Sequence, residues 1–503
     1  MGPRKRFMSG RRDEFYRQRR AKLDHLRQRG VDPYPPRYRR THTAAEALRA
    51  FQTWEEAGAT EPAPEVRVAG RIAALRDMGG ATFVDLRDGS GKLQAYLRRD
   101  ALGEEAYEGL HDLDLGDFLG VAGSLFRTRA GEVTVNVREH MLLAKALLPP
   151  PEKWHGLADV ETRHRQRYLD LMANQEARDL FALRSRVVAA IRGFMDGRGF
   201  LEVETPVLLP EAGGAAARPF VTRYEALDRD FYLRIATELH LKRLIVGGFD
   251  RVFEIGRVFR NEGLSARHNP EFTLLESYEA YADYNDVASM VEQLVSQVAQ
   301  ELLGTTRVPN DGGELDLSPP WRRLTVADGL RQYAGLELEA HWEEAALRSA
   351  VEKMGIEAPP GAGWAKLVDE LLSTCVEPRL IEPTFLMDYP AALSPLAKRK
   401  PEDRRFVERF EPFVAGLELG NAYTELNDPL EQRERFQEQE RRRAAGDEEA
   451  EVVDEDFLRA LEYGMPPTGG LGLGIDRLVM ILTGQRAIRQ VILFPQLRTR
   501  EQE

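Results

Sequence analysis

The stretch RVFEIGRVFRNEGLSARHNPEFTLLESYEAYADY, from Arg251 to Tyr284, decides the fold of this chain because it reads as two β-strands joined by a charged loop. The pattern predicts strands over Val252–Phe259 and Glu271–Ala280. Side chains alternate between the two faces of a strand. One face of the second strand therefore presents an aromatic ring, a carboxylate and a phenol, from Phe272, Leu274, Glu276 and Tyr278.

The loop between these strands is rich in charge, with Gly263 as its flexible point. The planar fork of an arginine side chain matches the geometry of a phosphate group. The loop therefore indicates a site for phosphate chemistry, and its charged residues are Arg260, Glu262, Arg267 and His268.

Three segments resemble, in order, the signature motifs of the class II aminoacyl-tRNA synthetases. FRNE, Phe259–Glu262, is similar to the second motif, and the longer form RNEGLSARHNPEFT is similar to the lysine branch of that class. GFLEVETPVL, Gly199–Leu208, is similar to the first motif, a helix end running into a strand that builds the family's dimer interface. GGLGLGIDRLVMIL, Gly469–Leu482, is similar to the third, a strand entering a helix.

The resemblance implies an α+β multidomain fold, with an N-terminal OB-fold β-barrel and a class II catalytic domain whose antiparallel β-sheet is flanked by helices. It also implies a reaction. L-Lysine and ATP would form lysyl-adenylate and pyrophosphate, and the lysine would then pass to the 3′ end of tRNA(Lys). A displacement at phosphorus depends mainly on positioning and charge neutralisation. We therefore expect cationic side chains and Mg²⁺ at the site, in a homodimer.

The resemblance also assigns the ATP-binding residues. Arg260 would contact the α-phosphate and the amino-acid carboxylate, and Arg477 would cover one face of adenine and reach the γ-phosphate. These two arginines are the predicted catalytic residues. Glu262 would bind the adenine amino group, His268 the outer phosphates, and Phe272 would stack on adenine.

Two further features belong to this expected nucleotide site. Gly470, Gly472 and Gly474 alternate along one strand, which leaves a face free of side chains for a nucleotide, although glycine here could equally serve tight packing. Mg²⁺ prefers hard oxygen ligands, few of them from protein. Glu411 and Glu418 match the family's carboxylate ligands, whereas a single glutamate in an acidic chain is more often a surface charge.

A lysine side chain requires carboxylates at the far end of its pocket, and a buried carboxylate without a cationic partner is costly. The resemblance places Glu276, Tyr278 and Glu425 around the ε-ammonium group. Glu238 and the backbone of Gly214 would hold the α-amino group, Asn421 the carboxylate, and Tyr423 would pack along the aliphatic stem. The alternative for Glu276 and Glu425 is a structural ion pair with Arg234 or Arg243.

Length and composition bound these expectations. A chain of 503 residues with 43% hydrophobic residues predicts two or three domains. The net charge of −12 argues against a protein that coats nucleic acid through bulk charge. One cysteine, Cys375, excludes a disulfide framework, and no apolar run reaches the length that spans a bilayer, so we expect a cytoplasmic protein without membrane partners.

The domain boundaries follow from composition. Residues 1–60 form a basic, helical N-terminal arm, residues 61–148 the OB-fold, and residues 149–503 the catalytic domain. The catalytic domain carries a helical insertion at about 314–383, in which no chemical motif is obvious. Contact of the arm with RNA or phosphate, and a solvated helix packed on the next domain, are both open.

Short alternating runs from Val66 to Leu143 predict the antiparallel barrel. An OB-fold stacks exposed bases on aromatic side chains of its outer face. By resemblance Phe83 would stack on an anticodon base, and Arg71 and Gln94 would read base edges. The alternative is that Phe83 faces the catalytic domain.

Three other functions compete with lysine–tRNA ligation. An aspartate or asparagine enzyme shares the barrel and catalytic plan, but its pocket would need cationic or amide groups in place of the glutamates. A lysine-activating paralogue that modifies protein lacks the barrel. A non-catalytic sensor of RNA or lysine would not need the ATP and metal residues.

Overall fold

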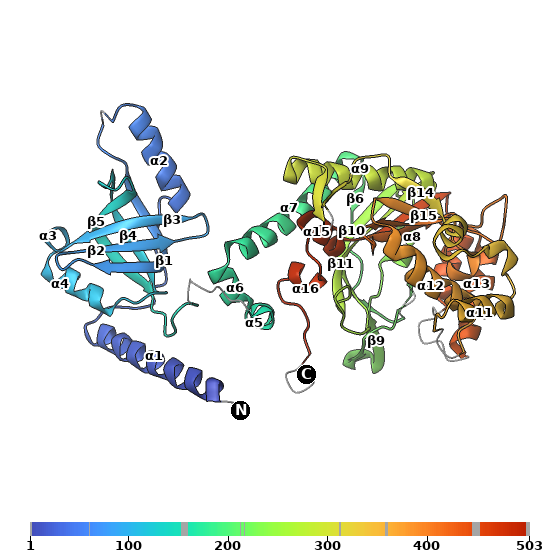
Figure 1. Ribbon diagram of the computed structural model, residues 1–503, viewed down its shortest axis with the longest axis horizontal. Helices are drawn as coiled ribbons and strands as arrows, with labels where there is room; N and C mark the ends of the chain where they lie inside the picture. The colour runs from blue at the N-terminus through green and yellow to red at the C-terminus, as the bar shows by residue number, and fades with distance from the viewer. Residues whose placement is uncertain are drawn as a thin grey trace. The chain divides into compact units, whose positions relative to one another are not determined.

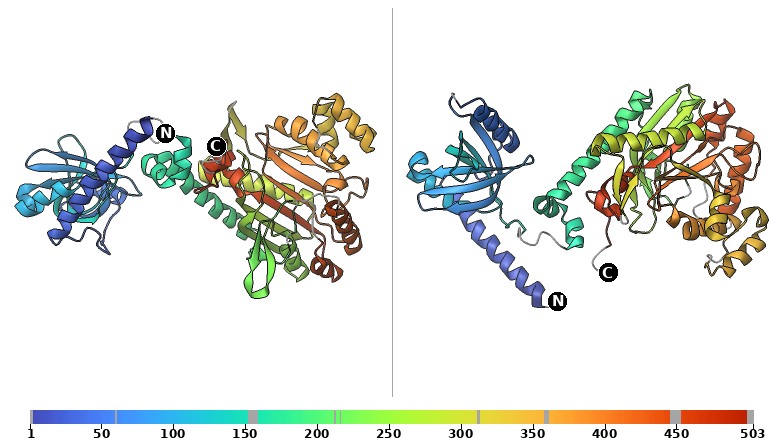
Figure 2. Two further views of the ribbon diagram at one scale, coloured as in Figure 1. Left: turned by 90° about the horizontal axis from the view of Figure 1, so that it is seen from below. Right: turned by 45° about the horizontal axis from the view of Figure 1, so that its top comes forward.

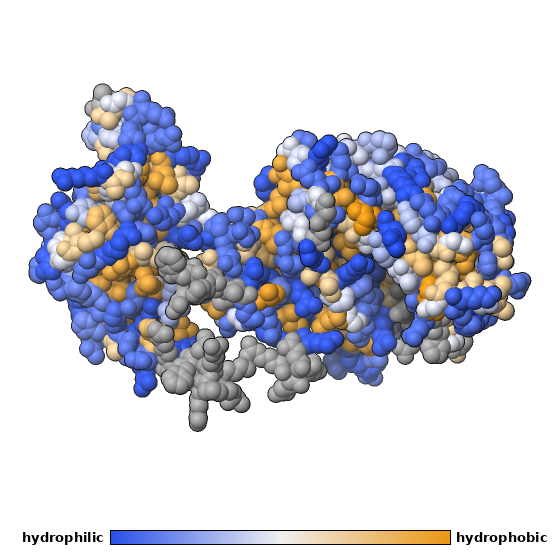
Figure 3. Space-filling view, in the orientation of Figure 1, coloured by the Kyte–Doolittle hydropathy of each residue, from blue (hydrophilic) through white to orange (hydrophobic). Residues whose placement is uncertain are grey.

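The computed structural model describes residues 3–59, 61–151, 159–211, 213–215, 217–310, 313–357, 361–444 and 453–498, without the side chains of residues 3–11. The chain forms two compact units, residues 1–158 and residues 159–503 (Figure 1). Polar residues cover most of the face drawn in Figure 3. No described helix combines the length and the apolar character that a membrane crossing requires.

The first unit is a closed barrel with helices around it, which we call the barrel unit (Figure 1). Its strands are hydrogen-bonded in the order β1-β2-β3-β5-β4. Alternate apolar residues such as Val84, Leu86, Leu93 and Leu97 fill the interior. The elements are α1 (Pro3–Gln28), α2 (Ala44–Glu56), β1 (Glu65–Asp77), β2 (Ala81–Arg87), β3 (Lys92–Arg98), α3 (Arg99–Leu102), α4 (Glu104–Glu108), β4 (Phe118–Arg127) and β5 (Val133–Ala144).

The basic N-terminal arm contains α1 and α2, and α1 packs against the rest of the barrel unit. Leu23 and Leu26 are buried, and the Arg19 guanidinium donates hydrogen bonds to the carbonyl oxygens of Ala146 (3.0 Å) and Leu148 (3.1 Å). One face of the arm is therefore structural, as one of the two sequence interpretations expected. Ion pairs join Lys22 to Asp114 and Arg29 to Asp112, and the His25 ring is hydrogen-bonded to Asp112. The side chains of Arg4, Lys5, Arg6 and Arg11 lie outside the described residues.

The second unit is built on a mixed sheet with strand order β14-β15-β16-β18-β19-β11-β10-β6. The pairs β14–β15 and β10–β6 at its two edges are parallel, and the pairs between them are antiparallel, so the predicted antiparallel sheet holds for the centre. The strands are β6 (Leu201–Glu202), β7 (Leu208–Leu209), β8 (Val221–Tyr224), β9 (Arg229–Leu233), β10 (Arg251–Phe259), β11 (Glu271–Ala280), β12 (Arg307–Asn310), β13 (Gly313–Asp316), β14 (Arg322–Thr325), β15 (Thr384–Met387), β16 (Arg409–Val414), β17 (Leu417–Glu418), β18 (Gly420–Thr424) and β19 (Thr468–Gly474).

Helices cover both faces of this sheet (Figure 2). On one face α7, α9 and α15 share a core with Leu275 of β11 and Leu471 and Leu473 of β19. On the other face α8, α13 and α14 pack near Tyr278. The helices are α5 (Val160–Arg165), α6 (Arg167–Ala173), α7 (Gln175–Gly197), α8 (Glu238–Val246), α9 (Tyr284–Leu303), α10 (Val326–Gly329), α11 (Glu344–Lys353), α12 (Trp364–Leu371), α13 (Pro429–Ala444), α14 (Glu455–Glu462), α15 (Ile475–Thr483) and α16 (Ile488–Val491).

The elements predicted around the three motifs are confirmed. The two strands of the opening segment are β10 and β11, and they pair with Val258 opposite Phe272. The first motif runs from the end of α7 into β6, and the third runs from β19 into α15. Because Leu275 faces the helical core, the residues on either side of it, Leu274 and Glu276, face the opposite side of the sheet.

Candidate active site

A cavity of about 1790 Å³ opens on the sheet face that Glu276 and Tyr278 occupy. It brings together every residue that the sequence assigned to ATP, lysine or metal, from segments far apart in the chain. Strands β11, β16, β18 and β19, helix α8 and the loop after β10 all contribute. These residues are Gly214, Glu238, Arg260, Glu262, His268, Phe272, Glu276, Tyr278, Glu411, Glu418, Asn421, Tyr423, Glu425 and Arg477.

Cationic side chains gather at one part of the cavity. The Arg260 guanidinium lies 5.2 Å from the centre of the Phe272 ring. Arg477, in the first turn of α15, donates a hydrogen bond to the Glu418 carbonyl oxygen (2.8 Å), and its guanidinium lies 3.4 Å from His268 Nε2. Burial and the positive charge of Arg477 lower the pKa of His268. These groups can neutralise a polyanion beside an aromatic ring.

Carboxylates line the neighbouring wall. Glu411 on β16 accepts a hydrogen bond from the Tyr389 hydroxyl (2.7 Å) and pairs with Arg409 (2.6 Å), while Glu418 lies on β17 and pairs with Arg477 (3.1 Å). Burial, opposed by Arg409, brings the pKa of Glu411 to about 7. These two carboxylates repel each other, and a bound cation would reduce this repulsion.

Glu377 belongs to the predicted insertion, where no chemical motif was obvious in the sequence, yet it lines this cavity. Burial, followed by the negative charges of Glu411 and Glu418, raises its pKa to about 8. Asp369 of α12 lines the same cavity. The insertion therefore contributes acidic side chains to the site, which neither motif nor spacing could indicate.

The predicted lysine pocket is a cluster of buried carboxylates and phenols. Glu276 and Glu425 are 3% and 1% exposed. Glu276 accepts a hydrogen bond from the Thr237 backbone N–H (2.9 Å), and burial raises its pKa to about 7. The Tyr278 hydroxyl donates a hydrogen bond to Glu276 (3.4 Å), and the Tyr423 hydroxyl donates one to Glu238 (2.7 Å). Such a cluster is complementary to a cationic ligand.

The alternative prediction, an ion pair of Glu276 or Glu425 with Arg234 or Arg243, is wrong. Arg234 pairs with Glu254, and Arg243 pairs with Asp454 and Asp456. Glu425 instead pairs through Oε2 with Lys242, a residue that the sequence analysis missed. Apart from this ion pair, neither carboxylate oxygen of Glu425 has a hydrogen-bond partner among the described residues. The position of Lys242 one helical turn after Glu238 was the available signal.

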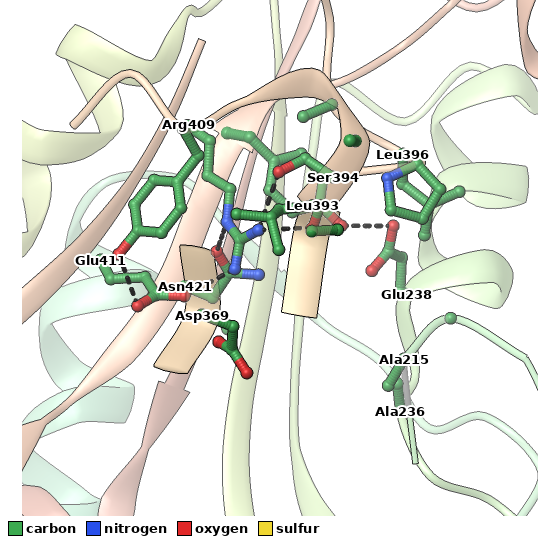
Figure 4. A pocket seen from close by; sticks show the side chains of 18 of the residues that line it. Ala215, Ala236, Glu238, Asp369, Leu393, Ser394, Leu396, Arg409, Glu411 and Asn421 are labelled. Carbon is green, nitrogen blue, oxygen red and sulfur yellow. Dashed lines mark hydrogen bonds and ion pairs between the residues drawn. The ribbon is translucent and has the colours of Figure 1, made fainter. Parts of the chain in front are cut away.

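Asn421 lies beside Arg409, across the cavity from Glu238 (Figure 4). The Arg409 guanidinium donates to the Asn421 side-chain oxygen (2.8 Å) and to the Ser394 hydroxyl (2.8 Å). In Figure 4, Glu238 lies across the cavity from Arg409, near Ala215 and Ala236. Arg409 therefore orients Asn421 and Glu411 together, a role that no sequence motif marked.

The glycines of β19 allow side chains from neighbouring strands to lie close to the backbone of this strand. Gly470 pairs with Tyr278 on β11 and with Tyr423 on β18. A Cβ atom at Gly470 would stand 1.8 Å from Glu425 Oε1 and 2.7 Å from the Tyr278 ring. Glycine is therefore required at this position because any side chain would occupy the carboxylate cluster.

In the barrel unit, Phe83 lies on the predicted outer face. Its ring stacks on Tyr96, with centroids 4.5 Å apart and planes tilted by 25°. Gln94 also lies on this face, but the residue is only 5% exposed, and its side-chain amide donates to Glu132 (3.0 Å) and accepts from Thr134 (2.9 Å). Arg71 donates to the Gly116 carbonyl oxygen and lies over the Phe118 ring. Tyr96 and Glu132 are thus additional members of the predicted base-reading surface.

Comparisons with known proteins agree with this division. Residues 159–498 match the family model described as class II tRNA synthetases (D, K and N), and residues 66–143 match the OB-fold nucleic acid binding domain. A protein named lysine–tRNA ligase from Dehalococcoides mccartyi is 57% identical over 485 residues, covering 96% of this chain and 97% of that protein. Proteins with the same name from Moorella thermoacetica and Chloroflexus aurantiacus are each 53% identical, over 96% and 98% of this chain and 97% and 99% of their own lengths.

The family model covers well over half of the chain, and the relatives align over almost all of it. The motif elements and the shared cavity agree with both findings. This chain therefore belongs to the class II tRNA synthetases of the D, K and N group, with an N-terminal OB-fold.

Proposed function

We propose that this chain is a lysine–tRNA ligase, which activates L-lysine with ATP and transfers it to tRNA(Lys). The observation that carries the proposal is the buried cluster of Glu238, Glu276 and Glu425 within the cavity that also holds Arg260 and Arg477. A ligand with ammonium groups compensates the desolvated carboxylates. The near full-length relatives named lysine–tRNA ligase support the same substrate.

An aspartate or asparagine enzyme is the nearest competitor within the family. Its substrate side chain would need cationic or amide groups at the end of the pocket. The carboxylates of Glu276 and Glu425 would instead repel aspartate and leave asparagine without charge complementarity. The pocket therefore favours lysine.

Each lysine contact follows from a group in the cavity. Glu276, Tyr278 and Glu425 would surround the ε-ammonium group. Glu238 and the Gly214 backbone would bind the α-amino group, because Gly214 lies beside Glu238 and Ala236. Tyr423 would pack along the aliphatic stem, and Asn421, oriented by Arg409, would bind the carboxylate.

ATP would lie between the Phe272 ring and Arg477. Arg260 would contact the α-phosphate and the lysine carboxylate, which keeps the two reacting groups together. His268 and Arg477 would hold the outer phosphates, and Glu262 would bind the adenine amino group. Fixed positive groups at these positions stabilise charge that develops as pyrophosphate leaves.

Glu411 and Glu418 suit Mg²⁺ because they supply hard oxygen atoms beside the cationic groups. Among the described residues no group of three or more acidic, histidine or cysteine side chains could hold a metal ion by itself. Two protein carboxylates, with phosphate oxygens and water completing the coordination, match the usual Mg²⁺ arrangement. When bound, the ion would neutralise phosphate charge, and Glu411 and Glu418 would hold it.

The remaining partners follow from other parts of the chain. The barrel unit would bind the anticodon of tRNA(Lys), with Phe83 stacking on a base and Arg71 and Gln94 reading base edges. A homodimer would form through the first motif. Exposed apolar side chains on and beside β6, β7 and β8 support it, namely Leu201, Val207, Leu208 and Val221.

The test is amino-acid-dependent exchange of pyrophosphate into ATP, run with the full chain, Mg²⁺ and each of the twenty amino acids, without tRNA. Exchange with lysine alone is expected. Exchange with aspartate or asparagine would overturn the pocket assignment, and no exchange with folded protein would favour the sensor.

A further inference from the structure

Lys242 is a buried cation whose contacts link two parts of the proposed lysine pocket. Its side chain has no exposed surface, and its ammonium group reaches Glu238 Oε1 and Glu425 Oε2. Glu238 precedes it by one turn of α8, whereas Glu425 follows β18. Lys242 is not among the residues that line the cavity, so it contacts these carboxylates from behind.

The charged and titratable groups around Lys242 come from several elements. Glu238 is on α8, Glu276 and Tyr278 are on β11, and Tyr423 and Glu425 are on or just after β18. The rings of Tyr278, Tyr423 and Phe457 lie 6.0, 5.4 and 5.8 Å from the ammonium nitrogen. Burial disfavours the ammonium form, but Glu238 and Glu425 outweigh it and raise the pKa of Lys242. Lys242 therefore carries its charge.

Lys242 is the one cation that the described structure pairs with these carboxylates. Glu238 and Glu425 share this single ammonium group, and Arg260 is the positive charge that acts on Glu276. Lysine brings two ammonium groups to this part of the cavity, and its carboxylate faces Arg260 in the proposed arrangement. Lys242 thus keeps Glu238 and Glu425 ionised and in place for a substrate with two ammonium groups.

We propose that Lys242 is a positioning and specificity residue, which holds Glu238 and Glu425 in place and sets the pocket charge for a substrate with two ammonium groups. This inference rests on the proposed lysine pocket. Without the ammonium group, the three carboxylates would repel one another, and at least one of them would take up a proton in place of the lost cation. A protonated carboxyl group attracts the substrate ammonium groups less strongly.

The test compares Lys242→Met with Arg243→Met in the full chain. Arg243 is the adjacent cation on α8, but its partners Asp454 and Asp456 lie outside the cluster. For Lys242→Met we expect the KM for lysine to rise about tenfold or more and the KM for ATP to stay within about twofold. Arg243→Met should leave both values near those of the wild type.

The pH profile separates positioning from folding. Because Lys242 lowers the pKa of Glu425, its loss moves proton release from the carboxylates to higher pH, so the ratio of variant to wild-type KM for lysine should fall as the pH rises. Equal increases in both KM values, or a pH-independent ratio, would overturn the proposal. If Lys242→Met does not fold, Lys242→Arg decides. A wild-type pH profile supports the charge role, and joint increases for lysine and ATP refute it.

The two proposals fail in different ways. If the wild-type chain exchanges pyrophosphate with an amino acid other than lysine, the proposed function is wrong. If the wild type exchanges with lysine and the Lys242 variants keep a wild-type KM for lysine, only the role of Lys242 is wrong.

Discussion

Replacing Glu425 with glutamine removes one negative charge from the proposed lysine pocket with little change in shape. Glu425 is 1% exposed, its Oε2 pairs with Lys242, and its Oε1 has no hydrogen-bond partner among the described residues. A buried carboxylate oxygen without a donor is costly, so a ligand ammonium group that reached it would form a strong contact. In the proposed complex Oε1 accepts a charge-assisted hydrogen bond from the ε-ammonium group of lysine.

The magnitude follows from that single contact. A hydrogen bond to a charged group contributes about 1.5–3 kcal/mol in a desolvated site. Since about 1.4 kcal/mol corresponds to a factor of ten, we expect lysine binding to weaken about ten- to hundred-fold. The amide still accepts a hydrogen bond, and this places the expected loss toward the lower end. ATP binding should change less than about twofold because Glu425 does not contact the phosphate or adenine groups in the proposal.

Pyrophosphate exchange measures both effects, with lysine varied at saturating ATP and ATP varied at saturating lysine. A thermal unfolding curve for each variant monitors the fold. Equal losses for the two substrates would refute the assignment of Glu425 to lysine, and an unchanged KM for lysine would do the same.

Three further predictions test other parts of the chain. Phe83→Ala should slow tRNA charging while leaving lysine activation intact, and a parallel loss of activation would make Phe83 a folding residue instead. Gly470→Ala should abolish most lysine-dependent exchange, because its Cβ would stand 1.8 Å from Glu425 Oε1, and wild-type kinetics in this variant would contradict the pocket geometry. Burial, followed by Arg167, Arg489 and Arg163, lowers the pKa of His164 to about 4, below its ordinary value of 6.5. As the pH is lowered, His164 is therefore protonated in the unfolded chain before it is protonated in the folded chain. The free energy of unfolding should decrease as the pH drops from 6.5 toward 4. The melting temperature of His164→Gln should decrease less between pH 7 and pH 5 than that of the wild type. An equal decrease in the two proteins would refute this.

Local patterns in the sequence were sufficient for the elements around the three motifs. Strands β10 and β11 lie where the period-two pattern predicts them, since alternation reports which side chains share a face. The second and third motifs contain Arg260, Phe272, Glu276 and Arg477, whereas the resemblance alone assigned Glu238, Glu411, Glu418 and Glu425. Such motifs are readable because each lies within one strand, turn or helix start.

Only the tertiary structure decided which charges meet. Lys242 and Glu425 are distant in sequence, but the packing of α8 against the end of β18 brings their charges together. Glu377 belongs to an insertion without a motif, yet it lines the cavity. Likewise, Gln94 lies on the outer face that alternation predicted, but Glu132 and Thr134 cover its amide. Side-chain period records the face of a strand and not the neighbour across it. The chain alone therefore determined the family and the chemical groups, and the fold determined their pairing.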